Sequence, residues 1–254
     1  MNQLASLGIR TGALAFITVL CAGCPNPNTY GTPRTTPKGK VQHTVAAEGF
    51  GLDYETPGTT DPTTGQKTAG TKGSLTVPNF PTYQLRVGVT DTVDIGARIA
   101  NMSSLGADVK WNFIRGETFD MATVPGLQVF RLSTSSGSSD GSFTQFYANL
   151  PLVFGINLAD ALSIVPTAGI TYSLSSAEAL SDQDDAARTT DGLFVRAGLG
   201  FNFRISQKFA MHPEITLLKN VTDTDKNGDV LLYVFGLGFN FGSLPVYGAA
   251  EAGE

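Results

Sequence analysis

Cysteine is almost absent from this chain: its two residues, Cys21 and Cys24, both lie within the first 24 positions. No disulfide framework and no cysteine-based metal site can therefore form downstream. Charged residues make up only 15% of the 254 residues, against about 25% in a typical soluble domain. No Lys- or Arg-rich run occurs and the net charge is -5, so nucleic acid is not an expected partner. After residue 24 no apolar run reaches the roughly 18 residues that a membrane-spanning helix needs.

A targeting segment opens the chain. The first ten residues carry one positive charge, at Arg10, and residues 12–20 (GALAFITVL) are apolar but too few to cross a bilayer as a helix. A charged start, a short apolar core and small residues before a cleavage point are typical of a secretory signal peptide. We therefore predict a signal peptide over residues 1–23.

The end of this segment resembles the lipobox of bacterial lipoproteins. Ala22, Gly23 and Cys24 match its last three positions, although Cys21 stands where the family prefers Leu. The resemblance implies cleavage before Cys24 and attachment of a diacylglycerol to its sulfur. Pro25 follows instead of Asp, so the family's cue for retention in the inner membrane is absent. The alternative is ordinary secretion with an unmodified Cys24.

The next segment has the composition of a linker. Residues 25–39 (PNPNTYGTPRTTPKG) are rich in Pro, Thr and Asn, and such segments do not build a core. We predict that residues 24–39 form a lipidated N-terminus and a flexible, extended tether.

Apolar and polar residues alternate from about residue 40 onward. Strict alternation predicts β-strands, because successive side chains of a strand face opposite sides of the sheet. In the clearest case Leu193, Val195 and Leu199 fall on one face, and Arg196 and Asn202 on the other. Ten segments are predicted strands: 41–52, 82–90, 93–101, 105–114, 119–131, 145–158, 161–174, 192–204, 208–219 and 230–241.

The two faces of these segments differ in charge. From residue 82 onward the apolar face carries no charged residue, whereas the other face is rich in Gly, Asn, Ser and Thr and holds equal numbers of acidic and basic residues. A water-facing surface usually carries more Lys and Glu, so we predict that the apolar face contacts lipid and the polar face lines a narrow lumen. The charged residues of the polar face are Arg86, Asp94, Arg98, Asp108, Lys110, Asp120, Arg196 and Glu214. All of them except Asp120 are predicted members of a lumen ion-pair network.

Short and long connections alternate along the predicted strands. Short turns are expected at 91–92, 115–118, 159–160 and 206–207, and long loops at 53–81, 132–144, 175–191 and 220–229. Outer-membrane barrels have short periplasmic turns and longer external loops. Ten strands would place both chain ends on the periplasmic side, where a lipid on Cys24 would need them.

The last predicted strand resembles the terminal strand of outer-membrane β-barrel proteins, because Gly236 is followed by Phe239 and Phe241 at alternate positions. The resemblance to this superfamily covers residues 40–241. It implies an all-β fold, a closed up-and-down antiparallel transmembrane β-barrel of about ten strands, with eight possible. It also implies membrane lipid and the outer-membrane assembly machinery as partners. We assign the barrel to residues 40–242 and a C-terminal tail to residues 243–254.

The sequence offers little catalytic chemistry. His212 and Glu214 would be neighbours in the lumen, where an ion-pair network explains them better than catalysis. The omptin proteases, which are ten-stranded barrels, use a His at the extracellular rim, and no predicted loop here contains one. The barrel lipases need a Ser–His arrangement at the membrane face, which is also lacking. We therefore expect no enzyme and no catalytic residue.

One loop resembles the start of a calcium-binding loop. Residues 223–229 (DTDKNGD) place oxygen ligands at alternate positions, and Asp223, Asp225, Asn227 and Asp229 would be those ligands. Val234 occupies the position where a bidentate Glu is expected. A plain polar loop is therefore favoured over a calcium site, and no other cofactor is expected.

These observations favour an integral barrel lipoprotein of the bacterial outer membrane. Its role would be structural or one of surface interaction, with a polar, largely filled lumen and a surface ligand that the sequence does not identify. A narrow solute channel and a soluble β-protein tethered by its lipid are the alternatives.

Overall fold

The computed structural model of the chain is all-β, as the alternating pattern predicts. It describes residues 26–55, 59–60, 67–100, 104–136, 139–178, 188–222 and 229–245. Within these ranges no helix is long and apolar enough to cross a membrane. The predicted signal peptide, the predicted lipidation site Cys24 and most of the predicted C-terminal tail lie outside the described residues.

Ten strand positions form the barrel wall. Its strands are β1 (Val41–Glu55), β4 (Lys72–Gly88), β5 (Val93–Ala100), β6 (Ser104–Arg115), β7 (Phe119–Thr123), β8 (Gly126–Ser136), β9 (Ser139–Ala159), β10 (Leu162–Glu178), β11 (Arg188–Ser206), β12 (Phe209–Asn220) and β13 (Asp229–Gly242). The strands β7 and β8 follow one another along the same position, because both pair with β6 and β9.

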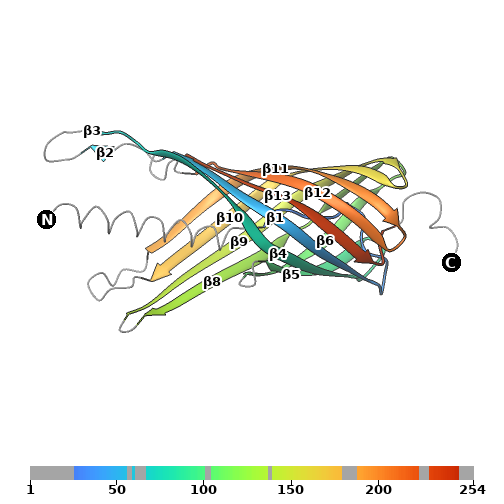
Figure 1. Cartoon of the computed structure of the whole chain (residues 1–254). Coiled ribbons are helices and arrows are strands. Elements are labelled where there is room, and N and C mark those ends of the chain that lie inside the picture. Colours follow the sequence, from blue (N-terminus) through green and yellow to red (C-terminus); the bar gives the residue numbers. More distant parts are fainter. Residues whose placement is uncertain are drawn as a thin grey trace.

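Antiparallel pairing closes these strands into a cylinder. Each strand pairs with its neighbours in the chain, and β1 pairs with β13 to join the two ends of the sheet. Figure 1 shows the strands tilted around one axis, with the separate pair β2 (Thr59–Thr60) and β3 (Lys67–Thr68) beyond one end. The closed antiparallel ten-strand barrel predicted from the sequence is therefore confirmed.

The structure divides one predicted strand and lengthens several others. Residues 119–131 were expected as one strand, but Pro125 interrupts it because proline has no N–H to donate to the ladder. The strand β4 begins at Lys72, ten residues before the expected start at 82, inside a predicted loop. Likewise, β9 starts at Ser139 and β11 at Arg188. Backbone hydrogen bonds can continue an antiparallel ladder past the point where the side-chain alternation ends.

The two ends of the barrel differ in their connections. Residues 89–92, 116–118, 160–161 and 207–208 make short turns at one end, which we call the turn end, and β1 begins and β13 ends there as well. The opposite end, here called the loop end, carries the connections between β1 and β4, β5 and β6, β8 and β9, β10 and β11, and β12 and β13. This is the alternation that the sequence predicts.

The outer surface of the wall is apolar. Outward side chains such as Ile95, Leu105, Leu150, Val195 and Leu199 are 40 to 59% exposed. The inward side chains are mostly polar and buried: Gln42, Thr44, Gln84, Arg86, Asp94, Lys110, Asn112, Thr171, Arg196, His212, Glu214, Thr216 and Asn240. A water-soluble barrel would show the reverse distribution, so the wall is built to face hydrocarbon.

The segment before β1 corrects one prediction. Residues 24–39 were expected to form a flexible tether, but residues 26–37 lie inside the barrel. Asn28 and Thr36 have no exposed surface and Tyr30 is 1% exposed. The same Asn and Thr side chains that suit a linker also form hydrogen bonds in a polar lumen, and composition does not distinguish the two situations.

Candidate functional site in the barrel lumen

Residues 26–37, which we call the plug, run through the lumen against the direction of β1, and the exposed residues 38–40 follow at the turn end. At the start of the plug, the Asn26 side chain donates hydrogen bonds to Glu48 and to Thr82, which lie midway along the wall. Just beyond the far end, the Gly39 N–H donates to the Gly88 carbonyl over 2.8 Å, at the turn end. A turn around Lys40 then leads into β1. The plug thus occupies the half of the lumen that adjoins the turn end.

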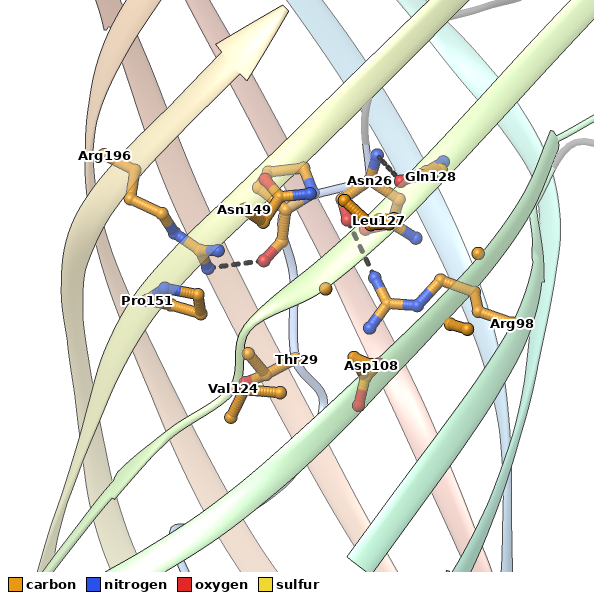
Figure 2. Close-up of a pocket in the computed structure, with 14 residues that line it drawn as sticks. Asn26, Thr29, Arg98, Asp108, Val124, Leu127, Gln128, Asn149, Pro151 and Arg196 are labelled. Carbon is orange, nitrogen blue, oxygen red and sulfur yellow. Dashed lines mark hydrogen bonds between the residues drawn. The ribbon is translucent and has the colours of Figure 1, made fainter.

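Two arginines hold the first residues of the plug by their carbonyl groups. Arg98 of β5 donates to the Asn26 and Asn28 carbonyls over 2.7 and 2.9 Å. Arg196 of β11 donates to the Pro27 carbonyl over 2.5 Å. Figure 2 shows both arginines reaching from different strands toward the plug between them. Three successive carbonyls are therefore fixed from two sides of the barrel.

A buried carboxylate holds the middle of the plug. Glu214 of β12 accepts the N–H groups of Thr29 and Tyr30, with distances of 2.9 and 2.7 Å. Tyr30 has a φ of 47°, a conformation that is rare for a residue with a side chain. Asn240 of β13 donates to the Tyr30 carbonyl over 2.9 Å. These bonds fix a backbone turn that the Tyr30 residue would not adopt on its own.

Charged wall residues also bind the second half of the plug. Lys110 of β6 donates to the carbonyls of Thr32 and Arg34 over 3.0 and 3.2 Å. The Arg34 guanidinium pairs with the buried Asp120 over 3.1 Å. Asp94 of β5 accepts the N–H of Thr36 over 2.9 Å. Wall side chains therefore bind the backbone of the plug and also pair with Arg34, which is its one buried positive charge among the described residues.

The structure places the seven predicted lumen charges on the inner wall, where four of them form ion pairs with one another and three do not. Ion pairs within the wall join Arg86 to Asp94 and Asp108, at 2.7 and 2.6 Å, and Lys110 to Asp94 at 3.9 Å. Arg98, Arg196 and Glu214 instead hold the plug backbone. Asp120, which was left out of the predicted network, pairs with the plug.

Glycines of β13 make room for the Tyr30 ring. A Cβ atom at Gly236 would lie 2.2 Å from the Tyr30 hydroxyl, and one at Gly238 would lie 2.8 Å from the Tyr30 Cβ. Gly88 and Gly155 meet the plug in the same way, at the Pro37 carbonyl and the Pro33 ring. Side chains at these positions would overlap the plug, so the wall is shaped to contain it.

Little free space remains beside the plug. One cavity of about 40 Å³ lies between Asn26, Thr29, Arg98 and Arg196, and another of about 20 Å³ lies beside Thr32 and neighbouring wall residues. Each has room for one or a few water molecules and none for a solute.

The remaining predicted site residues do not assemble into a reactive centre. His212 and Glu214 are neighbours, with 3.5 Å between Nε2 and the carboxylate, but both are buried beneath the plug. His43 bonds to the Tyr83 hydroxyl near the outer surface. Of the calcium candidates, Asp223, Asp225 and Asn227 lie outside the described residues. Asp229 pairs with Lys219. The described part of the chain contains no cluster of metal-ligating side chains.

Sequence reasoning missed the plug residues Asn26, Asn28, Tyr30, Arg34 and Thr36. Two features of the sequence pointed to a filled lumen. Many inward side chains of the wall can bind backbone groups, and glycines recur on the inward face of β13. Neither signal identifies the residues that fill the lumen.

Replacing Arg34 with Ala is expected to lower the free energy of unfolding by about 3 kcal/mol, because Asp120 would keep a buried charge without its cation. Urea unfolding in detergent or lipid measures this loss. The exposed Lys38→Ala is the matched control, with an expected change within about 0.5 kcal/mol. Equal losses for the two variants would contradict the role assigned to the Arg34–Asp120 pair.

Comparison with known proteins gives the fold only. No protein-family model and no curated sequence matches the chain. Among solved structures it is similar to the outer membrane protease OmpT of Escherichia coli, with a TM-score of 0.50 and 7% identity over 82% of this chain and 98% of that one. It also matches Ail of Yersinia pestis (TM-score 0.42, 9% identity, 80% and 98% covered) and the outer membrane protein OprG of Pseudomonas aeruginosa (0.35, 14%, 84% and 99%). The likeness to OmpT agrees with the closed barrel and carries no activity over to this chain.

Proposed function

We propose that this chain is an integral lipoprotein of the bacterial outer membrane whose barrel is closed to solutes by its own N-terminal segment. Its role is structural or one of surface interaction, carried by the loop end. The observation that supports this most directly is the plug, which is buried and bonded to charged residues on many strands of the wall. A channel would need that space open.

Planar-bilayer recording tests whether the barrel is closed. The purified full-length chain is expected to insert without producing steady single-channel currents, because the cavities beside the plug admit only water. Steady conductance of the unmodified protein would instead favour the alternative of a narrow solute channel.

Fractionation of cells carrying Cys24→Ser, with cleavage of the signal peptide verified, tests whether the barrel is integral. The variant is expected to remain in the outer membrane and to show heat-modifiable gel mobility, because the wall exposes apolar side chains around its circumference. Release of the variant into the soluble fraction would favour a soluble β-protein held only by its lipid.

A charge on the outer face should reveal the lipid contact. Leu199→Arg lies near the middle of β11 and is expected to destabilise the barrel by about 2–4 kcal/mol in a bilayer. Val221→Arg, which follows β12 at the loop end, is the control and should cost at most about 1 kcal/mol. Unfolding from lipid vesicles in urea measures both, and similar costs would argue against a bilayer around Leu199.

We propose no reaction for this chain. Neither histidine is placed to act on a substrate from outside the membrane, because His212 lies under the plug and His43 lies on the lipid-facing side. Calcium binding by the loop at 220–229 stays a prediction from the sequence.

A further inference from the structure

The direction of the plug determines where the chain enters the barrel. Asn26 lies at the level of Glu48 and Gln128, and the residues after it run toward the turn end. Asn26, the first described residue, is therefore the part of the plug that lies farthest from the turn end. Cys24 is two residues from Asn26, so their Cα atoms are at most about 7 Å apart.

The inward side chains of the wall change from polar to apolar on the loop-end side of Asn26. Toward the turn end the inward residues of β1 and its neighbours are polar, among them Gln42, Thr44, Glu48 and Gln84. Toward the loop end the inward faces of β1, β4 and β13 carry an apolar cluster. Its members are Phe50, Leu52, Tyr54, Leu75, Val77, Val230, Leu232 and Val234.

The registers place this cluster on adjacent strands and on one side of the sheet. Phe50 lies opposite both Val77 of β4 and Val234 of β13, and Leu52 lies opposite Leu75 and Leu232. Phe50 is two residues beyond Glu48 on β1, and side chains two apart share a face. Because Glu48 bonds to Asn26, the cluster starts within reach of Cys24. Apolar side chains are not expected on the inner wall of a water-filled lumen. An apolar group bound at that point would explain them.

We propose that the mature N-terminus enters the barrel from the loop end and that the acyl chains on Cys24 lie against the apolar cluster. This inference rests on the proposed lipidation of Cys24. The short chain between Asn26 and Cys24 brings the lipid to the loop half of the lumen, and the inner wall there is apolar. The lipid would then anchor the N-terminus on the side of the long loops.

Photo-crosslinking tests the proposal in the full-length protein in its membrane. A benzophenone derivative of phenylalanine replaces Phe50 in one variant and Val77 in a second. Gln84, an inward residue nearer the turn end, and Phe235, an outward residue, serve as matched control positions. Heat-modifiable mobility verifies that each variant is folded. Mass spectrometry then identifies the mass of the N-terminal peptide and the peptides crosslinked to it.

The expected result is an acylated N-terminal peptide whose acyl chains crosslink from positions 50 and 77 at least several-fold more than from 84 and 235. Crosslinks mainly from 235 would place the lipid in the bilayer outside the wall and overturn the proposal, while lipidation itself would stand. Crosslinks from 50 to residues 12–20 would show an uncleaved apolar segment at the cluster and overturn it as well. An N-terminus without acyl chains would refute both the proposal and the lipoprotein part of the proposed function.

Discussion

Deleting residues 26–36 is expected to convert the closed barrel into a conducting one. The wall is closed by its own strand ladders, including β1 with β13, and so does not depend on the plug for its hydrogen-bonded circumference. Without the plug, Arg98, Arg196, Glu214 and Lys110 would face water in an open lumen. Conduction depends on the width and lining of the pore, so we expect step-like currents at least roughly an order of magnitude above the wild-type background.

The deletion needs a control for folding and a milder companion. Heat-modifiable mobility shows whether the shortened chain still forms a barrel. The double variant Arg98→Met with Arg196→Met keeps the plug but removes the groups that hold its first carbonyls, so intermittent currents are expected. Lys38→Ala, which is exposed, should stay closed. A deletion variant that folds and yet conducts no better than wild type would contradict the role of the plug.

Replacing Gly238 with Val is expected to displace Tyr30 and to lower the free energy of unfolding by about 1–3 kcal/mol. The new Cβ would lie 2.8 Å from the Tyr30 Cβ, and Tyr30 is 1% exposed. The backbone at Tyr30 is also held by Glu214 and Asn240, so the ring and the wall cannot separate without loss of these hydrogen bonds. Urea unfolding of the membrane-embedded protein measures the effect.

A second substitution identifies the cause. Tyr30→Gly removes the ring and also relieves the positive φ, so the double variant should be more stable than the sum of the single changes predicts. The coupling energy is expected to be about 0.5–3 kcal/mol. Gly31→Ala is the control, because its Cβ would have no neighbour closer than 3.7 Å. Additive effects of the Gly238 and Tyr30 changes would show that the two residues do not compete for space.

The alternating pattern predicts the wall well because the membrane acts on every strand in the same way. Leu193, Val195 and Leu199 alternate with inward residues, and a shift of one residue would expose Arg196 to hydrocarbon. The ends of the strands are less well predicted. Beyond the bilayer both faces of β4 and β9 meet water or protein, and the alternation that marks a strand fades although the ladder continues.

The plug and the apolar cluster could not be predicted in the same way. The carbonyl groups of Asn26, Pro27 and Thr32 are bound by the wall, and every residue type offers a carbonyl group. Their partners are side chains brought together by a closed cylinder, which no local pattern encodes. In β13, Leu232 and Val234 are apolar on the inward face while Tyr233 and Phe235 are apolar on the outward face, so this stretch carries no alternation to interpret.

The position of the plug also constrains the order of assembly. The plug precedes β1 in the chain, and β1 with β13 forms the seam that completes the ring. The segment that fills the lumen is thus covalently joined to one edge of this seam, at the turn end. It is therefore already beside the sheet when β13 pairs with β1, and closing the wall can enclose it in the same event.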